Sequence, residues 1–118
     1  MAKLNTVINY LYRDASNYKM YNQVVLNGCL TPEQIREIFS CLYEGEYFIP
    51  SAVGLDEERF SEVTEDDHPW FELGTYAFDT TAYRPTTDVT PDALVKSFRQ
   101  CKDNWLQLEV EAGLRLYV

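Results

Sequence analysis

The residues best suited to chemistry gather in one acidic stretch of the chain, residues 56–70. Among its first twelve residues, seven are acidic and one, Arg59, is basic. Carboxylates at this density repel one another, so we expect a solvated surface loop or a short helix. Aromatic residues stand beside the charge, and an aromatic anchor inside a charged rim is typical of tight protein interfaces. We therefore predict partner contacts from Asp56, Glu57, Glu58, Phe60, Glu62, Glu65, Asp66, Asp67, Trp70 and Phe71.

Two other interpretations of the same stretch stay open. One is that its carboxylates form only a solvated face. The other is a metal site, in which Asp66, Asp67 and His68 would hold a hard or borderline cation. The stretch lacks the ligand spacing of an EF-hand calcium loop, and the single histidine excludes a histidine-rich zinc site within one molecule. No metal or cofactor is therefore predicted.

Catalysis would have to use His68, which is the only imidazole in the chain. Its nucleophile would be a serine or one of the three cysteines, Cys29, Cys41 and Cys101. Cys41 and Cys101 fall within predicted helices near their apolar faces, where a free cysteine acts as a small hydrophobe. No G-x-S-x-G nucleophile elbow is present. We therefore predict no catalytic residue, and expect a buried His68 that Asp66 or Asp67 orients and that locks the loop to the body.

The composition describes one folded domain, residues 1–118. Hydrophobic residues make up 46% of the chain and aromatic residues 14%, which is enough for a core. The net charge of −9 argues against nucleic acid or an anionic membrane as direct partners, because both require clustered Lys and Arg. The charge favours a basic protein surface as the partner, or solubility alone.

The cysteines and the first residues indicate a compartment. Three cysteines with no C-x-x-C pair favour a reducing environment over a disulfide framework. The opening residues, MAKLNT, lack an apolar signal core, and no apolar run approaches the roughly 18 residues that a membrane helix needs. We therefore predict a cytoplasmic protein.

Four segments have the composition of strands. Residues 4–13 and 19–27 are rich in β-branched and aromatic residues, and residues 14–17 (DASN) supply turn chemistry between them. This pattern predicts a β-hairpin. Two further strands are predicted at residues 46–53, which a proline interrupts, and at residues 70–78, where a glycine indicates a bulge.

Two helices are predicted from matching start signals. Thr31 is the N-cap of the first, a proline follows it, and Gln34 completes a capping box. Gly45 is placed to end this helix. Thr90 caps the second helix in the same way, and apolar residues follow at helical spacing. Apolar and polar residues alternate over residues 106–111, and residues 113–118 could close a terminal hairpin extension. The second helix could instead continue through Leu106.

Together these elements predict an α+β fold, an antiparallel sheet of about four to six strands with two helices packed on one face. Nothing in the chain has the regular strand–helix alternation of a parallel sheet. If residues 106–118 formed a hairpin, they could pair edge to edge with a second copy, so a homodimer is one expectation.

Four local phrases in the chain are familiar as a set. They are YRDASNYK at residues 12–19, EGEYFIP at 44–50, VGL at 53–55 and DDHPW at 66–70. In this order they resemble a group of small bacterial proteins of unknown function, some carried on phages or mobile elements. The resemblance covers roughly residues 4–90. It implies a bacterial or mobile-element origin and a single domain, and it assigns no functional residue.

These observations lead to three hypotheses of function. The first is a non-catalytic inhibitor or adaptor that docks on a basic surface, as anti-CRISPR proteins dock on host nucleic-acid-binding defence complexes. Carboxylates at phosphate-like spacing would compete for the Arg and Lys side chains that hold nucleic acid. The second is an immunity or antitoxin protein that neutralises a cationic toxin. The third is a small metal- or ligand-dependent enzyme that uses His68.

Overall fold

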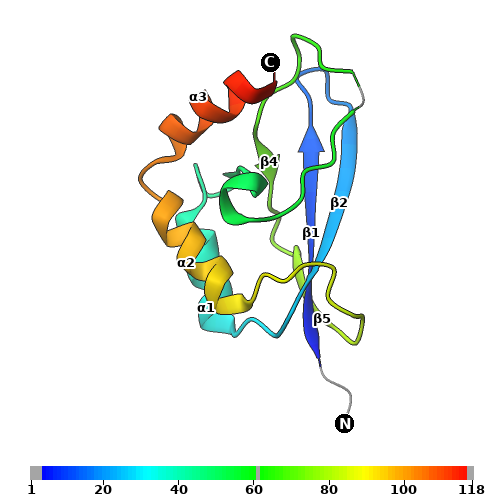
Figure 1. The fold of residues 1–118 in the computed structure, drawn as a ribbon, viewed down its shortest axis with the longest axis vertical. Helices are drawn as coiled ribbons and strands as arrows, with labels where there is room; N and C mark the ends of the chain where they lie inside the picture. The colour runs from blue at the N-terminus through cyan, green and yellow to red at the C-terminus, as the bar shows by residue number, and fades with distance from the viewer. Residues whose placement is uncertain (1–3, 61, 117–118) are drawn as a thin grey trace.

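The computed structural model describes residues 4–60 and 62–116. The elements follow the chain in the order β1 (Asn5–Arg13), β2 (Lys19–Leu26), α1 (Pro32–Cys41), β3 (Tyr47–Phe48), the 3-10 helix η1 (Pro50–Val53), β4 (Phe71–Glu72), β5 (Phe78–Thr81), α2 (Pro91–Cys101) and α3 (Trp105–Leu116). The five strands form one antiparallel sheet, and the helices lie on one side of it (Figure 1). The predicted α+β class is confirmed, with one α-helix more than we expected.

Strand β1 is the centre of the sheet. Strand β2 pairs with it along its length, from Thr6↔Leu26 to Arg13↔Lys19, which confirms the predicted hairpin. The other edge of β1 is shared by β5 and β4, and β3 continues the sheet beyond β4.

The prediction of one strand over residues 70–78 is wrong in detail, because this segment is divided between β4 and β5. Ile8 faces Phe78 while Leu11 faces Glu72, so three steps along β1 correspond to six along its partner. The surplus residues leave the sheet as a turn that is closed by the Ala77 N–H and the Gly74 carbonyl at 3.1 Å. The glycine therefore marks a whole turn and not a single-residue bulge.

The core lies between the sheet and the helices and is rich in aromatic rings. Its largest fully buried side chains are Tyr12, Phe48, Phe71, Phe98, Ile8, Leu26, Ile38, Ile49 and Leu94. Alternation along β1 places Ile8, Tyr10 and Tyr12 on this side. Tyr12 is close to the end of β1, so the core reaches up to the acidic stretch.

Helix α1 begins as predicted and ends earlier. The Thr31 hydroxyl accepts the Gln34 backbone N–H at 3.1 Å, and the side-chain amide oxygen of Gln34 accepts the Thr31 N–H at 2.9 Å, which confirms the capping box. The helix ends at Cys41, where Leu42 turns to an extended conformation. Gly45, predicted to end the helix, instead occupies a following turn with φ of 71°. The predicted strand over residues 46–53 shrinks to β3 (Tyr47–Phe48), because Pro50 begins a 3-10 helix.

The hairpin predicted for residues 106–118 is wrong, because the described part of this segment belongs to helix α3. Residues 117–118 lie outside the described residues. Helix α3 starts at Trp105, whose indole N–H donates to the Cys41 carbonyl at 2.6 Å and so satisfies one of the last carbonyls of α1. With no strand in α3, the predicted edge-to-edge pairing of this segment is also wrong. A homodimer by another route stays a prediction.

Among residues 4–60 and 62–116, no helix has the length and apolar character needed to cross a lipid bilayer.

Candidate functional site

The acidic stretch, residues 56–70, leaves η1 and passes over the end of the sheet where β1 turns into β2 (Figure 1). The backbone of this stretch is bound to the sheet. The buried Asn22 accepts the Glu58 N–H at 2.7 Å and donates to the Glu58 carbonyl at 3.2 Å. At the far end, the Ala15 N–H donates to the Asp66 carbonyl at 3.0 Å. The predicted surface loop is therefore held at both ends.

Arg59 is an internal cation of this acidic stretch. Its guanidinium donates to the His68 and Pro69 carbonyls at 2.5 and 3.2 Å and pairs with Glu57 at 3.2 Å. It also lies 4.7 Å from the ring centre of Tyr12, close enough for a cation–π contact. The Arg59 side chain is only 13% exposed. The largely buried Arg59 therefore joins the start of the stretch, at Glu57, to its end, at His68 and Pro69.

Asp67 fixes the loop to the core. The Tyr12 hydroxyl donates to the Asp67 carboxylate, which also accepts the Thr64 N–H at 2.8 Å. Burial, and then the hydrogen bond to Asp67, raises the pKa of Tyr12 to about 12. Tyr10, which donates to the Asp56 carbonyl at 2.5 Å, likewise has a raised pKa, first through burial and then through the neighbouring carboxylates.

His68 is half-buried and not buried as predicted. It locks the loop to the body, but not through the partners that the sequence suggested. Its Nε2 lies 2.7 Å from the Arg13 carbonyl, and its Nδ1 accepts the Trp70 N–H at 3.1 Å. This pattern assigns a neutral ring with the proton on Nε2. The prediction that Asp66 or Asp67 orients His68 is therefore wrong.

The chemistry that we considered for His68 finds no support in its surroundings. Both ring nitrogens are engaged by backbone groups, so neither faces a nucleophile or a metal. Within the described residues, no group of three or more His, Cys, Asp or Glu side chains is placed to hold a metal ion. Cys41 and Cys101 are buried, and burial raises the pKa of the Cys101 thiol. Cys29 is exposed.

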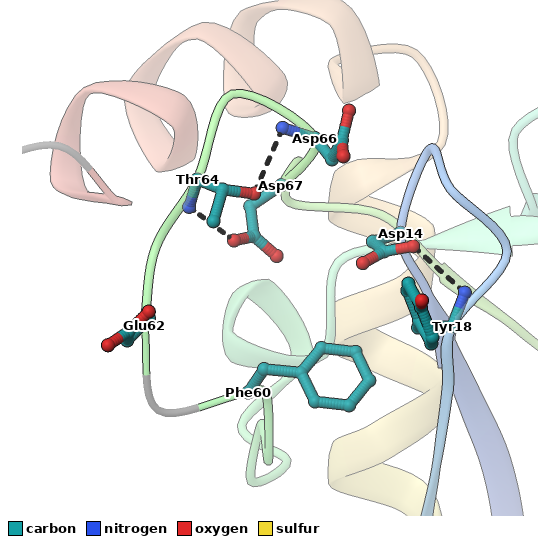
Figure 2. A pocket seen from close by; sticks show the side chains of 7 residues that line it. All are labelled: Asp14, Tyr18, Phe60, Glu62, Thr64, Asp66 and Asp67. Carbon is teal, nitrogen blue, oxygen red and sulfur yellow. Dashed lines mark hydrogen bonds between the residues drawn. The ribbon is translucent and has the colours of Figure 1, made fainter.

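A hollow of about 390 Å³ opens between the acidic stretch and the β1–β2 turn (Figure 2). It is lined by Asp14, Tyr18, Phe60, Glu62, Thr64, Asp66 and Asp67. We call it the acidic hollow. The Tyr18 and Phe60 rings meet edge to face at its base, with their centres 6.5 Å apart. Four carboxylates thus surround a space with an aromatic floor, an arrangement that suits an organic cation.

The predicted contact residues separate into two groups. Glu57, Asp66 and Asp67 bond to the protein itself, Asp66 through the Ser16 hydroxyl at 2.6 Å. Asp56, Glu58, Glu62 and Glu65 are exposed. No ion pair joins any of these four to another described residue.

The predicted aromatic anchors also separate. Phe60 is half-buried and lines the acidic hollow. Trp70 is half-buried, and its ring stacks on Tyr43 away from that hollow. Phe71 is 0% exposed and belongs to the core, so its predicted role as a contact residue is wrong. Its position inside a strand, alternating with the half-buried Glu72, explains its burial.

Sequence reasoning missed the residues that the β1–β2 turn contributes. Asp14 and Tyr18 line the acidic hollow, although they lie far from the acidic stretch in sequence. The Asp14 carboxylate accepts the Ser16 and Tyr18 N–H groups at 3.0 and 2.9 Å, and this Asx-type turn sets the direction of Tyr18. The turn composition was visible in the sequence, but its contact with the acidic stretch was not.

No protein-family model, curated protein or solved structure matches this chain. Its function is therefore argued from the geometry of its own residues.

Proposed function

We propose that this protein is a non-catalytic acidic binding protein that docks on a basic protein surface through residues 56–70. The acidic hollow would receive an Arg or Lys side chain of the partner, and the exposed carboxylates around it would form the charged rim. The observation that carries this proposal is the pairing of a firmly anchored loop with four exposed carboxylates, Asp56, Glu58, Glu62 and Glu65.

Rigidity supports this proposal more than charge does. A flexible acidic loop would lose conformational entropy on binding, which weakens an interface. Here Arg59, Tyr12 and Asn22 hold the backbone in place before any partner arrives. Exposed carboxylates at fixed positions can also steer a cationic partner during encounter.

The class of partner follows from the charge. Because a fixed array of carboxylates competes for the side chains that bind phosphate, a nucleic-acid-binding protein is the partner we favour, as in the inhibition of a defence complex in the cytoplasm. An immunity protein that neutralises a cationic toxin would use the same surface. The two are separated by the identity of the captured protein, which an affinity pull-down from the native host would give.

The test of this surface is a matched pair of variants measured against the captured partner. The first variant carries Glu58→Gln, Glu62→Gln and Glu65→Gln, which spares the carboxylates that hold the loop. The control carries Asp88→Asn, Asp103→Asn and Glu111→Gln, an equal change of net charge at exposed positions elsewhere.

Exposed charge pairs contribute about 0.2–1 kcal/mol each, so the first variant should bind roughly tenfold more weakly and the control within about twofold of the native protein. Affinity of the native protein should also fall as salt is added. Binding that responded neither to salt nor to the first variant would contradict the proposal.

A further inference from the structure

A second hollow, of about 250 Å³, lies beside the same loop and has different walls. It is lined by Tyr43, Glu44, Tyr47, His68 and Trp70, and we call it the aromatic hollow. Asp67 lines the acidic hollow and the next residue, His68, lines the aromatic one. The two spaces are thus neighbours, and none of the five residues of the aromatic hollow lines the acidic one.

The rings of the aromatic hollow are placed by a tight turn after α1. Tyr43 and Tyr47 face each other across an antiparallel bridge, with the Tyr43 N–H donating to the Tyr47 carbonyl at 2.8 Å. Side chains at directly opposed positions project to the same side. Trp70 stacks on Tyr43 with ring centres 4.9 Å apart and meets Tyr47 edge to face at 6.5 Å. Three electron-rich rings therefore gather at one place.

Glu44 supplies a carboxylate from a strained backbone position. It has φ of 54°, the following Gly45 has φ of 71°, and the Glu46 N–H donates to the Tyr43 carbonyl at 3.1 Å. Two successive positive φ values with this bond are typical of a type I′ turn, whose central positions favour Asn, Asp and Gly. Glutamate there costs about 1–2 kcal/mol. Strain of this kind is characteristic of functional positions.

The electrostatic field at the aromatic hollow is negative. The pKa of Tyr47 is raised first by the Glu46 carboxylate, then by burial and by Glu72 and Glu44. Arg13, the cation that acts against this shift in the pKa of Tyr47, is paired with Glu72 at 2.9 Å. Both ring nitrogens of His68 are engaged by backbone groups. A cation entering this space would meet carboxylates and ring faces.

We propose that the aromatic hollow binds an alkylated ammonium group, such as a quaternary ammonium head or a methylated lysine side chain. Such cations are weakly hydrated and favour aromatic walls with one carboxylate, whereas a metal ion needs several oxygen or nitrogen ligands. A volume of about 250 Å³ is below the roughly 300–1,000 Å³ of sites for drug-sized ligands, so a head group fits better than a large molecule. This proposal does not rest on the docking function.

The first experiment compares choline with its uncharged isostere, in which carbon replaces the ammonium nitrogen. Isotopically labelled protein is titrated with each, and the indole N–H signal of Trp70 is followed by NMR. The signal of Trp105 is the internal control, because its indole is buried and bonded to Cys41. A cation–π contact contributes about 0.5–2 kcal/mol, which corresponds to roughly twofold to thirtyfold in affinity. Choline should therefore bind at least about twofold more tightly than the isostere, with an affinity in roughly the millimolar range.

Two variants locate the choline-binding site, and a methylated peptide identifies the kind of natural ligand. Glu44→Asn keeps a residue that tolerates positive φ and removes the carboxylate, so it should remain folded and bind choline several-fold more weakly. Tyr18→Ala, in the acidic hollow, should leave choline binding unchanged. A peptide with one trimethyllysine that binds more tightly than choline would indicate a partner side chain as the natural ligand, and the reverse order would indicate a free small molecule.

Several outcomes would overturn the proposal. One is equal binding of choline and its isostere. Another is an unmoved Trp70 signal at ~100 mM choline, a concentration well above the millimolar dissociation constant expected of a small cation. A third is a set of shifts that map to Tyr18 and Phe60 in the acidic hollow. The triple variant of Glu58, Glu62 and Glu65 should leave the choline titration unchanged, which makes failure here distinguishable from failure of the docking proposal.

Discussion

Replacing Tyr12 by Phe removes one hydroxyl and leaves the ring that the core requires. The ring is fully buried against Phe71, with centres 5.2 Å apart, and beneath the Arg59 guanidinium. The hydroxyl donates to Asp67 and receives the His68 N–H at 3.4 Å. Tyr12→Phe therefore tests one link, the anchor of the acidic stretch to the sheet.

The expected loss in stability of Tyr12→Phe follows from the hydrogen-bond partners of Asp67. A hydrogen bond to a charged acceptor contributes about 1.5–3 kcal/mol. Asp67 keeps the Thr64 N–H and is only half-buried, so water can replace the lost donor in part. We expect the free energy of unfolding to fall by about 1.5–2 kcal/mol. An unfolding entropy of about 2.1 cal/mol/K per residue over 118 residues converts this loss to a decrease of about 6–8 °C in Tm.

Thermal and urea unfolding measure this loss, with Tyr18→Phe as the control. Tyr18 is 68% exposed and no described residue accepts its hydroxyl, so its variant should stay within about 0.5 kcal/mol of the native protein. Amide exchange at residues 64–68 should rise in Tyr12→Phe alone. If Tyr12→Phe unfolded with the native midpoint, the anchor that we infer would not exist.

The same variant should also change how the stability of the protein depends on pH in the alkaline range. Because the pKa of Tyr12 rises from 10.0 to about 12 on folding, its neutral form is favoured in the native state. The stability that this shift contributes is fully present below pH 10 and is lost as pH rises through about 12. The difference in stability between the native protein and Tyr12→Phe should therefore narrow over that interval. A constant difference would contradict the raised pKa of Tyr12, which burial and then the hydrogen bond to Asp67 cause.

Two further substitutions test the contacts that hold the site. Arg59→Met keeps the apolar stem but leaves Glu57 and the partly buried His68 and Pro69 carbonyls without this donor, so urea unfolding should show a loss of about 3 kcal/mol in stability, with a smaller loss for Arg59→Lys. A loss in stability under about 1 kcal/mol would mean that Arg59 does not hold the start and the end of the acidic stretch together. Trp105→Phe removes the donor to the Cys41 carbonyl and should cost about 1–3 kcal/mol, measured against Trp70→Phe, because the Trp70 indole N–H bonds to no described residue. Equal losses would contradict the capping of α1 by α3.

Elements whose signals are local could be predicted from the sequence. The capping box of Thr31 and Gln34 depends on residues three apart, and the β1–β2 hairpin depends on a short turn between two strand-like segments. Both were found at the predicted positions. The acidic stretch was also identified, because its charge density is a property of neighbouring residues.

The sequence left the region of helix α3 open between a hairpin and a helix for a physical reason. Leu106 and Val110 point to solvent, with exposures of 62% and 63%, while Leu108 packs against the core. Apolar residues on both the exposed and the buried side of a helix imitate the period of two that marks a strand. The sequence could not show which apolar residues would find a partner.

The partners of His68 and the walls of the acidic hollow depend on contacts between distant segments. His68 binds the Arg13 carbonyl, a backbone atom that no side-chain pattern reveals. Asp14 and Tyr18 meet the acidic stretch only because the β1–β2 turn lies beside it in space. The acidic neighbours of His68 were the obvious candidates by spacing, yet Asp67 turns toward Tyr12 instead.

The exposed carboxylates of the acidic stretch can be neutralised without removing those that hold the loop. Such a variant can therefore decide whether the stretch is a docking surface or only a solvated face. Glu58, Glu62 and Glu65 are exposed at the edge of an acidic stretch, so neutralising them relieves repulsion and should raise stability by a few tenths of a kcal/mol. On a solvated face this gain has no functional cost. On a docking surface the same variant gains stability and loses affinity, the compromise expected where binding conflicts with folding. Unfolding and binding measured on one sample therefore decide between the two, and a gain in stability with native affinity would leave the carboxylates with solubility alone.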